Sequence, residues 1–169
     1  PEYSGDVYDP NTGSDMVPFD AGQVDTTVNT PAVSSSGSTQ TLDWYGVGFD
    51  LINKNKSITI YDINSGITWS ATYINGKNHA DVIPASQGDA QTLINNKITG
   101  DYVRRPVVVT IAGQKYAGSM YAVGHGDTYY CNYFSGVMCI HFTGSQTHGS
   151  QKVDSDHQNA IGQALQSGF

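Results

Sequence analysis

The sequence predicts an α+β, β-rich domain, mainly antiparallel strands in a sheet or sandwich with two helices. Segments of alternating apolar and polar residues, rich in β-branched and aromatic side chains, indicate the strands. The composition agrees, because only 14% of residues are charged while glycine (19) and tyrosine (11) are abundant. Two apolar stripes with helical spacing, at about 86–98 and 155–166, predict the helices.

The chain divides into an acidic N-terminal arm, residues 1–40, and a single β-rich domain, residues 41–169. The arm holds six acidic residues and no lysine or arginine, and Gly, Ser, Thr, Asn and Pro dominate it. Such a segment buries too little apolar surface to fold alone. We expect either a flexible tether or self-association, in which residues 1–33 pack on a neighbouring copy in a homo-oligomer.

The first half of the domain reads as strands and turns. Residues 44–52 mix aromatic and aliphatic side chains with two glycines, which indicates an edge strand or an irregular entry. Residues 57–61 and 67–74 alternate on either side of the turn signal Asn64-Ser65-Gly66, which predicts a β-hairpin.

The second half begins with a helix over about 86–98, for which Ser86 is the expected N-cap. Residues 107–111 are all β-branched and predict a strand, and residues 115–123 alternate and predict the next one. The final helix, at about 155–166, follows a cap at Asp154 or Ser155.

The charge balance narrows the classes of function. The formal net charge is −7, and nucleic-acid binding is not expected because it requires clustered Lys and Arg. No apolar run approaches the length of a transmembrane segment. A surface that relies on hydroxyl and amide groups more than on charges is typical of secreted proteins, so we expect an extracellular or cell-surface location.

The chemistry concentrates between residues 124 and 150, which hold both cysteines and three of the five histidines. Cys139 lies two residues before His141, so in a regular strand the two side chains share a face. A cysteine nucleophile needs a base within hydrogen-bond reach and no cofactor. We predict that Cys139 is the nucleophile, that His125 is the general base or orients it, and that His141 is a second imidazole.

Other polar side chains are candidates for substrate binding. Asn132, Ser145 and His148 are candidates for orientation and for contacts to an oxyanion. Arg104 and Arg105 precede Pro106 and are suited to holding the carboxylate of an acidic peptide, although a solvated pair is the alternative.

The order His125-Gly126, a short interval and then Cys139-Ile140-His141 resembles the signature of L,D-transpeptidases, with His141 in the cationic position. These are secreted cysteine enzymes that cross-link peptidoglycan, and the resemblance extends over about residues 55–166. It implies a similar fold and acyl transfer on peptidoglycan stem peptides. The sequence departs from the pattern at Gly136, at Met138 and at Val137, which replaces the family's histidine.

A disulfide between Cys131 and Cys139 is the strongest alternative. In a hairpin that turns near Ser135, the two residues lie opposite each other, close enough for a bridge. The chain would then be a secreted structural subunit, with the hairpin fixed by the disulfide and no nucleophile.

A zinc site is the third possibility. His79, Asp81, His125 and His141 provide enough ligands, and His148 provides another. This set predicts a zinc-dependent cell-wall peptidase.

Overall fold

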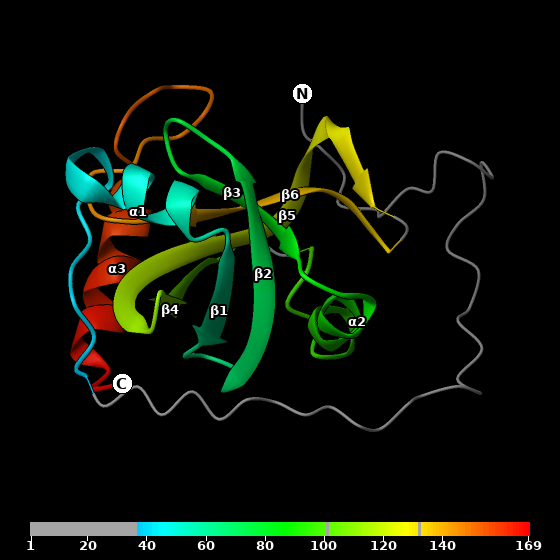
Figure 1. Cartoon of the computed structure of the whole chain (residues 1–169), viewed down its shortest axis with the longest axis horizontal. Coiled ribbons are helices and arrows are strands. Elements are labelled where there is room, and N and C mark those ends of the chain that lie inside the picture. Colours follow the sequence, from blue (N-terminus) through cyan, green and yellow to red (C-terminus); the bar gives the residue numbers. More distant parts are fainter. Residues whose placement is uncertain (1–36, 101, 132) are drawn as a thin grey trace.

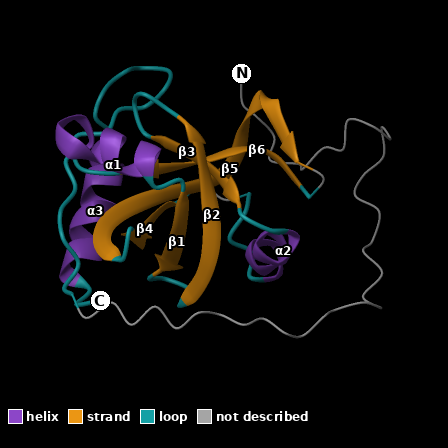
Figure 2. Ribbon diagram, viewed as in Figure 1, coloured by secondary structure: helices purple, strands orange, loops and turns teal. Residues whose placement is uncertain are grey.

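The computed structural model describes residues 37–100, 102–131 and 133–169, without the side chains of residues 125–131. Six antiparallel strands close into a barrel in the order β1-β2-β3-β6-β5-β4. The strands are β1 (Ser57–Asp62), β2 (Ile67–Asn75), β3 (Ala80–Pro84), β4 (Arg104–Ile111), β5 (Gln114–Cys131) and β6 (Phe134–His141). The predicted α+β class is confirmed, and the layers form a closed barrel rather than a sandwich (Figures 1 and 2).

The barrel closes because β1 pairs with β2 on one side and with β4 on the other. The predicted hairpin is confirmed as β1 and β2, with Ile60 opposite Trp69. Alternate residues of each strand fill the interior, where Ile60, Val107 and Val109 are fully buried. Closure leaves each strand paired on both sides and turns one apolar face per strand into a common core.

Both predicted helices are present. α2 (Gln87–Asn95) begins after Ser86, whose Oγ accepts a hydrogen bond from Asp89 N, and it lies beside β2 (Figure 1). α3 (Ser155–Gln166) begins after Asp154, and it packs against β4 and β5. An N-cap acceptor satisfies amide groups that have no partner within the first turn.

The expected edge strand over residues 44–52 is wrong. The chain forms a π-helical turn, Trp44–Gly48, followed by α1 (Phe49–Lys54). Trp44 anchors this segment, because its Nε1 donates to the Lys77 carbonyl at 2.8 Å and its ring stacks on Phe142. At Gly48 a Cβ would lie 2.9 Å from the Asp43 carbonyl oxygen, so this helical turn depends on glycine. The aromatic and aliphatic residues suggested a strand, whereas Gly48 permits the close helical turn.

The register of β5 and β6 overturns the geometry expected for a disulfide. The hairpin pairs Cys131 with Phe134, so the strands part from each other closer to Cys131 than the turn expected near Ser135. Cys139 is opposite Tyr121, ten residues before Cys131 on the same strand, and it carries a buried thiol. The predicted Cys131–Cys139 bridge is therefore absent from this structure.

The start of the described chain is attached to the domain. Thr39 N donates to the Phe169 carbonyl at 2.9 Å, and Gln40 bridges to Tyr116 of β5. Of the arm predicted over residues 1–40, residues 1–36 lie outside the described residues, and so does the whole segment 1–33 for which self-association is predicted. Over the described ranges, no helix combines the length and the apolar character needed to cross a membrane.

Candidate functional site

Four chemically active side chains lie on the outer face of two paired strands. Asp81 of β3 is the register partner of Cys139 of β6. His79 immediately precedes β3, and its ring stacks on that of His141 with the ring centroids 4.3 Å apart. We call His79, Asp81, Cys139 and His141 the cross-strand quartet. Their strand neighbours alternate with them and belong to the core: Ala80, Val82, Met138 and Ile140.

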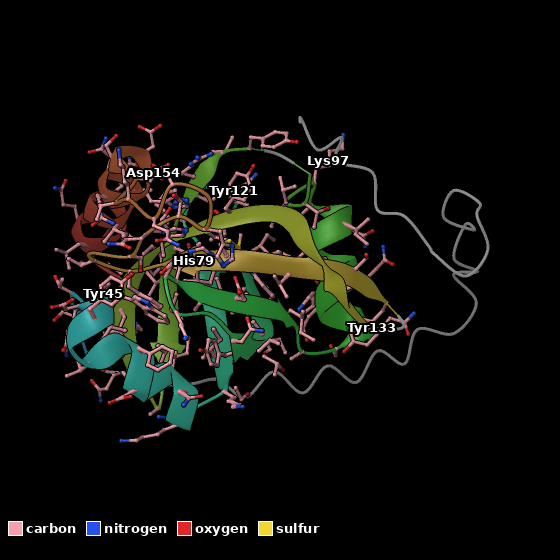
Figure 3. The ribbon with its side chains drawn as sticks, turned by 90° about the horizontal axis from the view of Figure 1, so that it is seen from above. Tyr45, His79, Lys97, Tyr121, Tyr133 and Asp154 are labelled. Atoms are coloured by element: carbon pink, nitrogen blue, oxygen red, sulfur yellow. The ribbon has the colours of Figure 1, made fainter. Side chains whose placement is uncertain are left out.

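The same face continues across β5 and β4. Tyr121 is opposite Cys139, and Arg104 is opposite Tyr121, so one row of the sheet joins Asp81, Cys139, Tyr121 and Arg104. The Arg104 guanidinium carbon lies 5.0 Å from the centre of the Tyr121 ring, and its Nη2 lies 3.2 Å from Asp154. Figure 3 labels His79, Tyr121 and Asp154 on this side of the molecule.

Both ring nitrogens of His79 face oxygen atoms. Nδ1 lies 2.7 Å from the carbonyl oxygen of Gln146, and Nε2 lies 3.3 Å from Oδ1 of Asp81. A carbonyl accepts only, so Nδ1 carries a proton. Nε2 then directs either a second proton or a lone pair at the carboxylate. His79 and Asp81 are both almost fully buried.

Four imidazoles lie in series through the site, two pairs of them stacked and the pair of His148 with His79 tilted by 54°. The centroid distances are 4.1 Å between His148 and His79, 4.3 Å between His79 and His141, and 3.7 Å between His141 and His157. His157 comes from α3, and its Nδ1 lies 2.8 Å from Ser119 Oγ. We predict no site role for His157 from the sequence, although the residue is buried in the first turn after the Asp154 cap.

Burial sets the protonation of the central groups. Burial raises the pKa of the Cys139 thiol well above its usual range, and the charge of Asp81 raises it further, with Arg104 opposing. Burial also holds the pKa of His141 far below its usual value, as do its neighbours His157 and His79. The resting site therefore pairs a thiol with a neutral imidazole.

We expect the unfolding free energy of the metal-free protein to decrease as the pH falls from about 6.5 to about 4. Burial, and then the charge of Arg104, lowers the pKa of His157 from 6.5 to about 4. In this window the unfolded chain binds a proton that the folded chain excludes, so stability rises with pH. His157→Gln should lower the slope by up to about 1.4 kcal/mol per pH unit. Urea unfolding across this range measures both slopes, and equal slopes would contradict a neutral buried His157.

Two overlapping groups of donors are close enough to share a metal ion. The ligand atoms of His79, Cys139 and His141 all lie within 4.8 Å of one another, as do those of His79, Asp81 and His148. His148 Nε2 lies 3.6 Å from Asp81 Oδ2. The predicted zinc set of His79, Asp81 and His141 thus comes together, while the side chain of His125 lies outside the described residues.

The remaining predicted residues fall in different places. The backbone of His125 pairs with Val137, which lies two residues before Cys139 on β6. Asn132 lies outside the described residues. Ser145 is buried and its Oγ accepts a hydrogen bond from Phe142 N, which stabilises the turn after β6. Arg105 follows Arg104 in β4 and therefore points to the opposite face of the strand. It forms an ion pair with buried Asp62 at 2.9 Å, so its role in this structure is structural.

Comparisons with protein-family models, with curated proteins and with solved structures found no match to this chain. The chemistry of the cross-strand quartet is therefore the basis for a functional proposal.

Proposed function

We propose that this domain is an extracytoplasmic cysteine acyltransferase that acts on peptides of the peptidoglycan stem-peptide class. The observation that carries the proposal is the grouping of the Cys139 thiol with the imidazoles of His141 and His79 within 4.8 Å. Asp81 lies beside Cys139 across the strand pair. A thiol, a base and an acid that orients an imidazole are the elements of nucleophilic catalysis by cysteine.

His141 is the base that we assign to Cys139. Its Nδ1 is buried and has no hydrogen-bond partner among the described residues, and the imidazole is neutral. The Cys139 proton passes to His141 as sulfur attacks the acyl carbonyl, and the tetrahedral oxyanion collapses to a thioester. The amine that leaves takes the proton from His141. An acceptor amine or water then releases the acyl group and restores the thiol.

His79 and Asp81 support this step electrostatically. A second proton on Nε2 would make His79 an imidazolium whose Nδ1 donates to the Gln146 carbonyl and whose Nε2 faces the Asp81 carboxylate at 3.3 Å. That charge stabilises a thiolate on Cys139 during attack. Arg104, two strands away in the same row, is the proposed contact for a carboxylate of the stem peptide. The roles predicted for His125 and Asn132 remain predictions.

The proposal is tested by trapping the thioester. Metal-free protein mixed with a panel of synthetic stem peptides and quenched in acid should gain the mass of the acyl group. Peptide mapping should place it on Cys139. Cys131→Ala is the matched control, since Cys131 pairs with Phe134 far along β5, and it should form the same adduct. Absence of both adduct and product with every peptide, or an adduct on another residue, would overturn the proposal.

A further inference from the structure

Three members of the cross-strand quartet, His79, Cys139 and His141, bring their donor atoms close to the spacing of a metal centre, and the Asp81 carboxylate lies next to His79. Tetrahedral zinc with bonds of about 2.0–2.3 Å separates its ligand atoms by roughly 3.3–3.8 Å. His79 Nε2 and Asp81 Oδ1 are 3.3 Å apart, and the donor atoms of His79, Cys139 and His141 lie within 4.8 Å of one another. Side-chain rotations that draw His79, Cys139 and His141 together, and that turn the Asp81 carboxylate toward the same point, would bring all four donors onto one ion.

The surroundings of the two imidazoles leave one nitrogen of each suited to a metal ion. The Gln146 carbonyl takes the proton of His79 Nδ1, which leaves Nε2 to face Asp81 as a lone pair when the ring is neutral. A carbonyl on the far nitrogen is the usual outer contact of a metal-bound histidine. His141 Nδ1 is buried and makes no hydrogen bond within the described residues. A cation between these groups satisfies both nitrogens at once.

The charges also balance. Asp81 supplies one negative charge, and a bound metal would supply the second by deprotonating the Cys139 thiol. Two anions and two neutral imidazoles around a dication give a net charge of zero in a buried site, which limits the cost of burying ions. The nearby positive charge of Arg104 is already paired with Asp154 at 3.2 Å.

We propose that His79, Asp81, Cys139 and His141 bind one Zn²⁺ ion. Thiolate and imidazole are ligands that zinc prefers, and one sulfur, two nitrogens and one carboxylate oxygen complete a tetrahedron. His148 is the exposed imidazole beside this set, with 48% of its side chain accessible, and its Nε2 lies 3.6 Å from Asp81 Oδ2. Zinc on Cys139 occupies the sulfur lone pair that acyl transfer requires. The metal therefore holds the enzyme in an inactive form.

Cobalt substitution tests the ligand set without any activity assay. The full chain, stripped of metal with a chelator, is titrated with Co²⁺ and then with competing Zn²⁺. We expect one ion per chain, a thiolate-to-cobalt charge-transfer band in the near ultraviolet and visible bands of a tetrahedral complex. Zn²⁺ should abolish these bands by displacement.

Four variants locate the ion. Cys139→Ser should remove the charge-transfer band, and Cys139→Ser, Asp81→Asn and His141→Gln should each weaken Co²⁺ binding at least about 10-fold. His157→Gln is the matched control, because this buried imidazole stacks on His141 while its Nδ1 is taken by Ser119. Its cobalt spectrum and affinity should match the unmodified chain. Circular dichroism of each metal-free variant separates ligand loss from unfolding.

Two results would overturn the zinc site. The first is the absence of stoichiometric cobalt binding to a folded chain. The second is cobalt binding that shows no charge-transfer band and that persists in Cys139→Ser. That result would place the ion on His79, Asp81 and His148 instead.

The inhibition rests on the proposed acyl transfer, whereas the metal site does not. At a free Zn²⁺ concentration 100 times the Kd, thioester formation should be about 100-fold slower and should recover with chelator. Cobalt bands without thioester formation in metal-free protein would refute only the acyl transfer. Thioester formation without cobalt bands would refute only the zinc site.

Discussion

Replacement of Cys139 by serine is expected to lower kcat/KM for acyl transfer by at least about 10³-fold. The pKa of a hydroxyl lies far above that of a thiol, so the imidazole assigned to accept the thiol proton is a much poorer match for serine. Fold and stability should change little, because serine nearly matches cysteine in size at a position that is 5% exposed. Steady-state kinetics with metal-free protein and a peptide that forms the thioester measures the loss.

Combining Cys139→Ser with His141→Gln in one double variant provides a stricter test. His141→Gln alone should reduce kcat/KM by about 10²–10⁴-fold, the range of general-base catalysis. Groups that act as a unit have strongly non-additive effects, so Cys139→Ser with His141→Gln should be no slower than Cys139→Ser alone. Multiplied losses would mean that His141 does not accept the Cys139 proton. Cys131→Ala again serves as the control and should keep full activity.

Local patterns were sufficient for most of the elements. Alternation around Asn64-Ser65-Gly66 predicted the hairpin of β1 and β2, and the caps Ser86 and Asp154 predicted α2 and α3. Each of these signals lies within about a dozen residues of chain. The helical turn at Trp44 was not predicted, because its stability comes from contacts with Lys77 and Phe142, which are distant in sequence.

The site could be predicted only in its β6 half. Two-residue spacing was enough to place Cys139 and His141 on one face. No local sequence pattern predicts that β3 pairs with β6, which is almost sixty residues away. This pairing is what brings His79 and Asp81 close to Cys139. The disulfide error has a second cause, because the hairpin turns closer to Cys131 than expected and the register shifts twice between Tyr130 and Tyr121, which together place Cys139 opposite Tyr121.

Gly76→Ala is expected to destabilise the domain by about 3 kcal/mol or more and to lower its Tm by about 10 °C. Gly76 follows β2 with φ at +125°, a conformation that side chains other than glycine rarely adopt. A Cβ there would lie 2.0 Å from the His79 carbonyl oxygen and 3.2 Å from Asp81 N. Both contacts are backbone atoms, so the chain must move for the methyl group to fit.

Comparison with Gly66→Ala separates the energetic cost of the steric clash at Gly76 from the cost of placing alanine at a positive φ. Gly66 also has positive φ, +72°, in the turn between β1 and β2, but nothing lies within 4 Å of its added Cβ. Its replacement should therefore cost only about 1–2 kcal/mol. Urea and thermal unfolding compare the two variants. Because the Gly76 collision displaces the backbone of His79 and Asp81, Gly76→Ala should also weaken cobalt binding in the protein that remains folded, while Gly66→Ala should not. Equal stability losses in the two variants would show that the turn before β3 can relax without disturbing the site.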